Sequence, residues 1–397
     1  MSEAKLKSLL TRDAGGTPPG RIVRALSQKG TMSPREIAES TGLAKSTVST
    51  ALNELRRTGM VVDGVVENSR TSGVGRPSTT VSLNPEAGTC VGMLIGRDFM
   101  QLIVADVSHA VLGERTVELD PDFSAADAAQ VGARLLAEAY EENNLSRDTL
   151  LGVGIALGNP VNPNDGRMLR AGGMPAWAGL DIRAMFEPVL EQTIIADNES
   201  NCSAVAEMMW GAAIGYQDFV MFTLDEGIGG AIVSRGHVIT GIAGAAGEFG
   251  HMSIDPEGPL CRCGNRGCLE VYATTKEPLR VASQRYGRPI EAPELVAMAL
   301  AGDVGCQRLI EDTATIAGRG LGLIGAAINP PLIVVGGGFA AAGDLLLTPL
   351  EESFNKHTLV KRADVGGAAR TRFVVSRFVE NDACMGAVGL VLRRFGC

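Results

Sequence analysis

The sequence predicts an α/β protein in which a small, mainly helical N-terminal domain precedes a larger body. Two observations support this fold class. From Thr89 onward, strand patterns alternate with helix patterns, which is typical of α/β folds. Before that point lie three short amphipathic helical segments and a hairpin pattern. With 397 residues, the chain is long enough for two or three domains.

The charge follows this division. Residues 1–86 hold 12 Lys and Arg against 8 Asp and Glu, a charge of +4, and the rest of the chain carries −13. A basic domain joined to an acidic body suggests that the N-terminal part meets phosphate and the body does not. Residues 1–20 are polar and show no signal-peptide pattern, and most cysteines are scattered, so we expect a cytoplasmic protein. The uncharged stretch 321–343 contains Asn-Pro-Pro and three glycines, which predicts helix, turn, buried strand and glycine loop instead of a membrane span.

Three helices are expected in the N-terminal domain. The first is predicted at residues 21–30. The second begins at Ser33, because a serine, a proline and then Glu36 form a capping-box pattern. After a turn at residues 41–43, a third helix is predicted from about Ala44 to Thr58, with valine and leucine side chains facing inward.

The third helix carries the chemistry expected of a DNA-binding helix. Its polar face holds hydroxyls, an amide and a lysine, which suit base edges and phosphates in a major groove. With the hairpin that follows, the pattern predicts a winged helix-turn-helix, and a protein-interaction module is the alternative. Arg76, between Gly75 and Pro77, would enter a minor groove or else be a solvated loop residue. The expected DNA contacts are Lys45, Ser46, Thr47, Ser49, Thr50, Asn53, Arg56, Arg57 and Arg76.

One histidine and three cysteines lie close together just past the middle of the body: His251, Cys261, Cys263 and Cys268. The cysteines have C-x-C-x4-C spacing with glycines between the last two, and glycine permits the tight turns that this spacing needs. Cys3His is a standard closed ligand set for structural zinc. We therefore expect one structural Zn²⁺ per chain with no open position for a catalytic water. Buried thiols and a core histidine are the alternative, which the polar, proline-containing stretch 255–259 disfavours.

The elements of the body follow from apolar runs and helical periodicity. Strands are predicted at 90–95, 102–106, 151–157, 193–196, 219–224 and 230–234. Helices are predicted at 124–143, 200–210 and 381–394.

At this point the chain resembles the ROK family (repressors, open reading frames, kinases). The marks are the cysteine motif with Gly267–Glu270 and the run Gly247–His251, and the resemblance covers nearly the whole chain. It implies an actin-like, two-lobed sugar-kinase fold with a sugar site between the lobes, and the winged domain in front is typical of the repressor branch. The expected bounds are a flexible tail at 1–18, the winged helix-turn-helix at 19–84 and the ROK domain at 85–397. Lobe one would comprise about 88–198 plus 382–397, and lobe two about 199–381.

Three kinase elements of the family are altered here. In the first phosphate loop, G-x-D-x-G-G-T, Leu94 replaces the aspartate and Asp98 the threonine. In the second, T-x-G-T-G-I-G-G, Asp225 and Glu226 stand where phosphate would be held. Two unit charges about 4 Å apart repel by roughly 4 kcal/mol at an effective dielectric of about 20. One such repulsion would lower the affinity for a phosphate on the order of a thousandfold. The base position of N-D-x-N is Glu199, whose longer side chain displaces the carboxylate. We therefore predict no kinase activity and no catalytic residue.

The sugar side of the family site is better kept. The resemblance implies sugar contacts by Asn198, Glu199, Glu248, His251 and Glu270, with His251 using one ring nitrogen for zinc and the other toward ligand. For Glu199, a helix N-terminal carboxylate is an equal alternative. An asparagine that the family places before its Leu-Pro-x-Trp segment is Gly173 in this chain.

These observations predict a sequence-specific DNA-binding transcriptional regulator, with repression as the expected direction, that senses a sugar or sugar phosphate. Its partners would be double-stranded operator DNA, the sugar effector and further copies of itself in a homodimer or homotetramer, with no membrane. The alternatives are an ATP-dependent, glucokinase-like sugar kinase with a regulatory head, and a regulator that answers to a protein partner.

Overall fold

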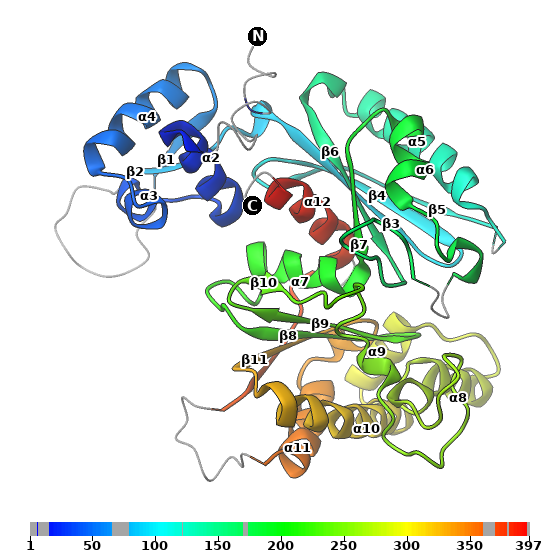
Figure 1. The fold of residues 1–397 in the computed structure, drawn as a ribbon. Coiled ribbons are helices and arrows are strands. Elements are labelled where there is room, and N and C mark those ends of the chain that lie inside the picture. The colour runs from blue at the N-terminus through cyan, green and yellow to red at the C-terminus, as the bar shows by residue number, and fades with distance from the viewer. Residues whose placement is uncertain are drawn as a thin grey trace. The chain divides into compact units, whose positions relative to one another are not determined.

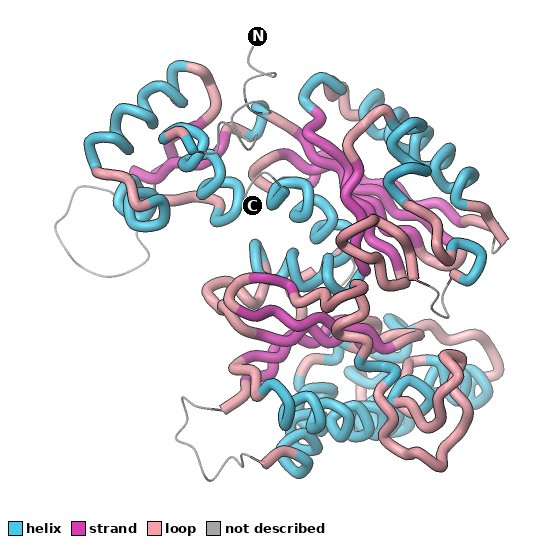
Figure 2. The backbone as a smooth tube through the Cα atoms, in the orientation of Figure 1, coloured by secondary structure: helices cyan, strands magenta, loops and turns pink. Residues whose placement is uncertain are grey.

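A computed structural model describes residues 6, 16–65, 79–120, 122–169, 174–359, 370–378 and 381–394, with backbone only at 28, 65 and 79. The chain forms two compact units (Figures 1 and 2). Unit 1 comprises residues 1–156, 182–196 and 387–397, and unit 2 comprises 157–181 and 197–386. Within the described residues, no helix is both long and apolar enough to cross a bilayer.

The N-terminal domain is three helices and a two-stranded antiparallel hairpin, as predicted. The helices are α2 (Pro18–Lys29), α3 (Pro34–Thr41) and α4 (Lys45–Arg57), and the strands are β1 (Val61–Val65) and β2 (Thr79–Leu83). The tip of the hairpin, and Arg76 with it, lies outside the described residues. The helices enclose a core that includes the fully buried Ile22, Leu26, Ile37, Leu52 and Leu55.

Local capping sets the helix boundaries in this domain. The capping box is confirmed, because the Glu36 amide donates to Ser33 Oγ (3.3 Å) and the Ser33 amide donates to Glu36 Oε2 (2.7 Å). The first helix begins three residues earlier than predicted. Thr17 caps it by accepting from the Gly20 amide (3.3 Å), and the prolines at 18 and 19 take the first helical positions, where no amide proton is needed.

In unit 1, five strands form a sheet in the order β5-β4-β3-β6-β7. They are β3 (Thr89–Ile95), β4 (Phe99–Asp106), β5 (Val111–Glu118), β6 (Leu150–Leu157) and β7 (Ile194–Asn198). The helices α5 (Ala125–Glu142) and α6 (Ile182–Leu190) pack together beside this sheet (Figure 1). β5 and α6 were not predicted from the sequence. β5 is an edge strand with exposed and half-buried residues only, so it lacks the apolar run that marks β3 and β4.

In unit 2, a second five-stranded sheet has the order β10-β9-β8-β11-β12. The strands are β8 (Phe219–Leu224), β9 (Ile228–Ser234), β10 (His237–Val238), β11 (Leu332–Gly336) and β12 (Arg372–Val375). The helices are α7 (Glu199–Trp210), α8 (Lys276–Tyr286), α9 (Ala292–Leu300), α10 (Val304–Ile328) and α11 (Asp344–His357). The uncharged stretch 321–343 is helix, turn, buried strand and glycine loop, as predicted.

Alternation along β8 and β11 gives the second sheet two apolar faces. Val220 and Phe222 of β8 join the core that contains α10 and α11, whereas Phe219 and Met221 join the core that contains Ala204 of α7. β11 alternates in the same way. Figure 1 shows α7 on one side of this sheet and α10 with α11 on the other. Both faces of the central strands are therefore buried, which explains why these strands read as continuous apolar runs.

The last described helix, α12 (Asp382–Arg394), packs closely through small residues. A Cβ added at Gly386 would lie 1.7 Å from the carbonyl oxygen of Cys202 in α7. Farther along, the backbone of Ala387 approaches β6 so closely that a Cβ at Gly154 would lie 2.0 Å from the Ala387 carbonyl oxygen. No side chain fits at either glycine without a backbone shift.

We expect Gly386→Ala to lower the free energy of unfolding by about 1–3 kcal/mol, because overpacking a closed contact has costs of this size. Helix propensity alone favours alanine by about 1 kcal/mol, so a net loss would report the steric contact. Gly16→Ala is the matched control, since no atom lies within 4 Å of a Cβ there. Denaturant unfolding of both variants is the measurement. Equal or higher stability of the Gly386 variant would contradict this packing.

Candidate functional site

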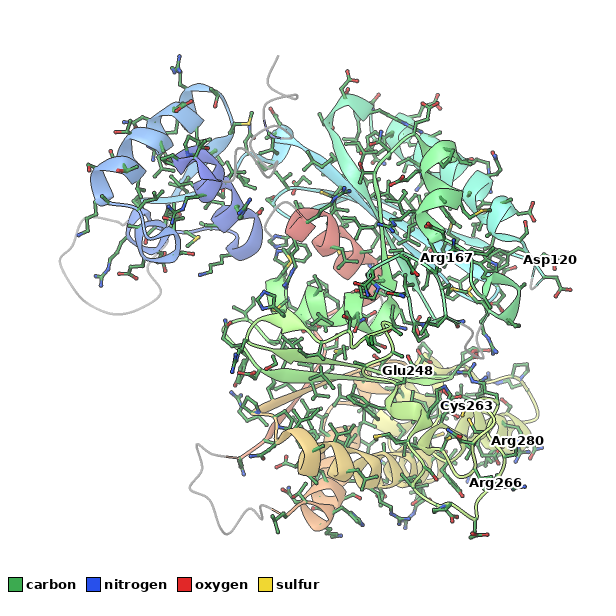
Figure 3. All side chains as sticks on the ribbon, in the orientation of Figure 1. Asp120, Arg167, Glu248, Cys263, Arg266 and Arg280 are labelled. Carbon is green, nitrogen blue, oxygen red and sulfur yellow. The ribbon has the colours of Figure 1, made fainter. Side chains whose placement is uncertain are left out.

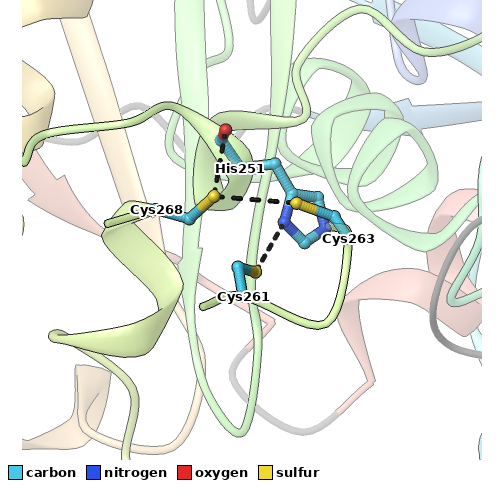
Figure 4. A group of neighbouring side chains, drawn as sticks. All are labelled: His251, Cys261, Cys263 and Cys268. Carbon is cyan, nitrogen blue, oxygen red and sulfur yellow. Dashed lines mark hydrogen bonds between the residues drawn. The ribbon is translucent and has the colours of Figure 1, made fainter. Parts of the chain in front are cut away.

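The histidine and the three cysteines come together in one loop region of unit 2. His251 ends a short 3-10 helix (Phe249–His251), and Cys268 directly precedes another (Leu269–Val271). Cys261 Sγ lies 3.6 Å from His251 Nδ1, and Cys263 Sγ lies 3.6 Å from Cys268 Sγ (Figure 4). All four ligand atoms lie within 4.8 Å of one another.

These separations fit a tetrahedral metal. With Zn–S near 2.3 Å and Zn–N near 2.0–2.1 Å, ligand atoms at tetrahedral corners are roughly 3.6–3.8 Å apart. A disulfide would instead need about 2.05 Å between sulfurs. Burial and the neighbouring thiols raise the pKa of Cys268 to about 12, so several thiolates in this space need a cation. The residues present therefore fit a metal ion, which would tie the loop together and supply local folding energy.

Glycine sets the path of the loop between the ligands. Gly264 and Gly267 both have positive φ, +95° and +58°. A Cβ at Gly267 would lie 1.6 Å from the Asp255 carbonyl oxygen, so only glycine fits directly before Cys268. The spacing of the motif thus depends on backbone conformations that other residues rarely adopt.

Three carboxylates predicted to contact sugar lie near this loop in unit 2. Glu248 Oε2 is 3.9 Å from His251 Nε2, so the imidazole faces a cysteine with one nitrogen and a carboxylate with the other. Glu248 and Cys263 are labelled in the same part of unit 2 in Figure 3. Burial, and then the charge of Glu270, raises the pKa of Glu248. The third carboxylate, Glu199, begins α7.

Glu199 has a perturbed acidity. Its desolvation, together with the charges of Asp382, Asp225 and Glu248, raises its pKa to about 7. Desolvation likewise raises the pKa of Asp382 to about 6. Near neutral pH, Glu199 therefore exists in both protonation states and can donate or accept a hydrogen bond.

Both polar groups of the Asn198 side chain have hydrogen-bond partners inside the protein. Its side-chain oxygen accepts from the Ser200 amide (2.9 Å) and caps α7, and its Nδ2 lies 3.5 Å from the Leu157 carbonyl oxygen. The residue is buried. Gly173, where the family pattern has asparagine, lies outside the described residues.

Arg262, the residue between the first two cysteines, was missed by the sequence analysis. Its Nε donates to Glu270 Oε1 (2.7 Å) and its Nη2 donates to Glu270 Oε2 (3.1 Å), a bidentate ion pair. The Ile228 amide also lies 3.4 Å from Glu270 Oε2. Arg262 thus links the metal loop to a carboxylate of the predicted sugar site. A basic residue inside a C-x-C motif was the available signal, but its partner is set by the fold.

The altered kinase positions are distributed over both units. Leu94 is a half-buried residue of β3, and Asp98 lies in the turn before β4. Asp225 and Glu226 directly follow β8 and are exposed, and Glu226 pairs with Lys276 (3.4 Å).

On the N-terminal domain, α4 presents its polar face to solvent. Lys45, Ser46, Ser49, Thr50, Asn53 and Arg57 are exposed, and Thr47 and Arg56 are half-buried. Three of these side chains have partners inside the domain, and one is Thr50, whose Oγ1 donates to the Ser46 carbonyl oxygen (3.1 Å). Arg56 forms a bidentate ion pair with Asp63 of β1 (2.8–3.1 Å) and donates to Asn53 Oδ1 (3.1 Å). The charge of Arg56 is therefore partly neutralised before any DNA is bound.

Comparisons with known proteins agree with this architecture. The family model for winged helix-turn-helix DNA-binding domains matches residues 20–62, and the ROK family model matches residues 90–394. The xylose repressor of Bacillus spizizenii is 26% identical over 314 residues, covering 79% of this chain and 80% of the repressor. A glucokinase of Halalkalibacterium halodurans is 30% identical over 248 residues, covering 58% of this chain and 74% of the kinase.

A crystal structure of a ROK family transcriptional regulator, described as a homologue of the E. coli MLC protein, has the same fold. Its TM-score is 0.74 at 23% identity, and the match covers 95% of each chain. This likeness confirms the predicted fold class, a winged helix-turn-helix followed by a two-lobed, actin-like domain. The family match extends over most of the chain, so the protein is a member of the ROK family that carries an N-terminal winged helix-turn-helix domain.

Proposed function

We propose that this protein is a sequence-specific DNA-binding transcriptional repressor whose ROK domain binds a sugar or sugar phosphate and does not transfer phosphate. One observation carries the proposal: α4 exposes a polar face on a winged helix-turn-helix domain that is joined to a ROK domain. The similarity to a xylose repressor over most of both chains supports it.

For DNA binding, α4 would lie in the major groove with Lys45 on phosphate and Thr47 and Asn53 toward base edges. One such helix reads few base pairs, so we propose a homodimer or homotetramer in which two helices read half-sites about 34–36 Å apart. The body carries a net charge of −13 and therefore supplies no net attraction to phosphate. Affinity would thus depend on the N-terminal domain and fall with salt.

For sugar binding, the carboxylates Glu199, Glu248 and Glu270 would accept hydrogen bonds from hydroxyl groups. We propose that the metal is a structural zinc held by His251, Cys261, Cys263 and Cys268. Zinc would supply the folding energy of the loop, and the loop in turn would fix Arg262 and Glu270. The metal would thus hold one wall of the sugar site in place.

The second candidate is a sugar kinase. A carboxylate with a pKa of about 7 is suited to general base catalysis, and Glu199 has that pKa. The glucokinase similarity points in the same direction. Against it, Asp225 and Glu226 place two carboxylates at the end of β8, where they would repel a nucleotide phosphate.

We expect one zinc per chain in protein purified without chelators, measured by elemental analysis. Cys261→Ser should lower this content and the thermal stability, because a tetrahedral site with three ligands binds zinc more weakly. Cys306→Ala, a buried cysteine outside the motif, should keep the zinc and is the control. Wild-type protein without zinc would contradict this assignment.

We expect no useful phosphate transfer from ATP to hexoses. A coupled ADP-release assay across common hexoses should show no sugar-dependent rate, because the phosphate positions carry carboxylates. A rate near 1 s⁻¹, within the usual range for enzymes, would favour the kinase instead.

We expect Lys45→Ala to weaken binding to all DNA sequences and to reduce the salt dependence by about one phosphate contact per N-terminal domain. Arg56→Ala should weaken binding less, because Arg56 is already paired with Asp63. Asn53→Ala should relax the sequence preference. The free-energy difference between the preferred base pair and the other base pairs at one position should shrink by about 1–3 kcal/mol. Lys356→Ala, in α11 of the body, is the control.

Footprinting on the DNA upstream of the gene, followed by titration of the variants on that site and on random DNA, is the measurement. A palindromic protected site is expected. Equal affinity of the wild type for both DNAs at physiological salt would contradict the regulator.

A further inference from the structure

A tight turn after α4 brings β1 back beside the helix. α4 ends at Arg57 and β1 begins at Val61. Between them Gly59 has a φ of +71°, a conformation that favours glycine, and its amide donates to the Arg56 carbonyl oxygen (3.0 Å). Because the turn is this short, β1 contacts α4 (Figure 1), and Asp63 of β1 meets Arg56 near the end of the helix.

The side chains of Asp63, Arg56 and Asn53 form a continuous hydrogen-bonded row across this junction. Nε and Nη2 of Arg56 donate to the Asp63 carboxylate at 2.8–3.1 Å. Nη1 of Arg56 donates to Asn53 Oδ1 (3.1 Å). A guanidinium is planar, and a bidentate carboxylate fixes the direction of its remaining N–H groups. Asp63 therefore fixes the guanidinium of Arg56, and the guanidinium in turn fixes the Asn53 amide.

The partner of Asn53 determines which way its amide group points. Arginine carries five N–H donors and no acceptor, so only the amide oxygen can face Arg56. The amide nitrogen then points away from Arg56, on a side chain that is exposed on the polar face of α4. An asparagine amide without such a partner rotates broadly and presents either atom. In this helix, Asn53 therefore offers DNA a donor in preference to an acceptor.

This orientation disfavours the base that asparagine commonly reads. A bidentate contact to adenine needs the amide oxygen to accept from N6 while the nitrogen donates to N7. Here the oxygen already faces a guanidinium, whose charge repels a further N–H donor. Guanine instead presents two acceptors, N7 and O6, in the major groove. We propose that Arg56, held by Asp63, is a positioning residue that orients Asn53 as a donor, and that Asn53 consequently reads guanine.

This inference rests on the proposed function, in which α4 lies in the major groove, and assigns Asn53 its base. The ion pair contributes little to folding, because its side chains are 32% (Arg56) and 44% (Asp63) exposed and exposed pairs are weak in water. Its removal thus tests positioning with the domain still folded. Glu54 provides the matched control: it is an exposed carboxylate of the same helix, and its loss changes the net charge by the same amount as the loss of Asp63.

Selection from randomised duplex DNA with the full-length protein identifies the base pair that Asn53 reads. The wild type should give an operator, and Asn53→Ala should lose preference at one position of each half-site by about fivefold to a hundredfold. We expect a G·C pair at that position. An A·T pair there, or no position that depends on Asn53, would overturn the proposal.

Competition binding on operators that differ only at this base pair tests the positioning. Asp63→Ala and Arg56→Ala should each lower the preference for G·C at least about threefold, and neither should lower it further in the Asn53→Ala background. Glu54→Ala should keep the wild-type preference. Variants at two members of the row cover the case that one of them fails to fold, which thermal melting reveals. Wild-type preference in a folded Asp63→Ala or Arg56→Ala variant would contradict the positioning role.

Binding to random DNA separates positioning from a purely structural role. Asp63→Ala releases the Arg56 cation, so this variant should bind random DNA more tightly than Glu54→Ala does, with a salt dependence larger by about one phosphate contact per N-terminal domain. Weaker binding to all DNA would indicate a structural defect and count against the proposal. A wild type with no preferred sequence would contradict the proposed function and the inference with it. A clear operator whose preference survives the loss of Asp63 and of Arg56 overturns the inference alone.

Discussion

The parallel pairing of β8 with β11 is the constraint on which unit 2 depends. Its register determines which side chains of both strands face α7 and which face α10 and α11. A shift by one residue would exchange the two faces and leave large apolar side chains against the wrong helices. The same register decides which residues emerge together where the strands end. The core and the chemistry at the strand ends are therefore fixed by one set of backbone hydrogen bonds.

The elements with strong local signals could be predicted from the sequence. Each of these signals lies within a short segment of the sequence. Examples are the capping box at Ser33, the apolar runs of β8 and β11, and the Cys3His spacing. The predicted start of α2 was three residues too late, because the two prolines at its start were interpreted as part of the N-terminal tail. The edge strand β5 was missed because half of its residues are exposed, so its pattern resembles a polar loop.

The predicted sites were harder to read at the level of single contacts. The residues of the metal cluster were visible, but the pairing of Arg262 with Glu270 joins residues from two sides of the loop. In the N-terminal domain, the ion pair of Arg56 with Asp63 connects a helix to a strand. Such pairs depend on the tertiary fold, and a sequence shows only that both charges exist. Arg56 was predicted as a DNA contact, and the structure adds an ion pair with Asp63 that the sequence did not indicate.

The close contact between α12 and β6 has a consequence for protein synthesis. Gly154 meets Ala387 in unit 1, yet the two residues are separated by the whole of unit 2 in the chain. At about 5–20 residues per second, the ribosome needs roughly 10–40 s to pass from residue 196 to residue 387. During that interval the surface of β6 that meets Ala387 lacks its helix, while the ribosome synthesises unit 2. In the nascent chain, chaperones and proteases therefore have access to the sheet of unit 1. A premature stop codon before α12 would leave this sheet without that helix in the finished product.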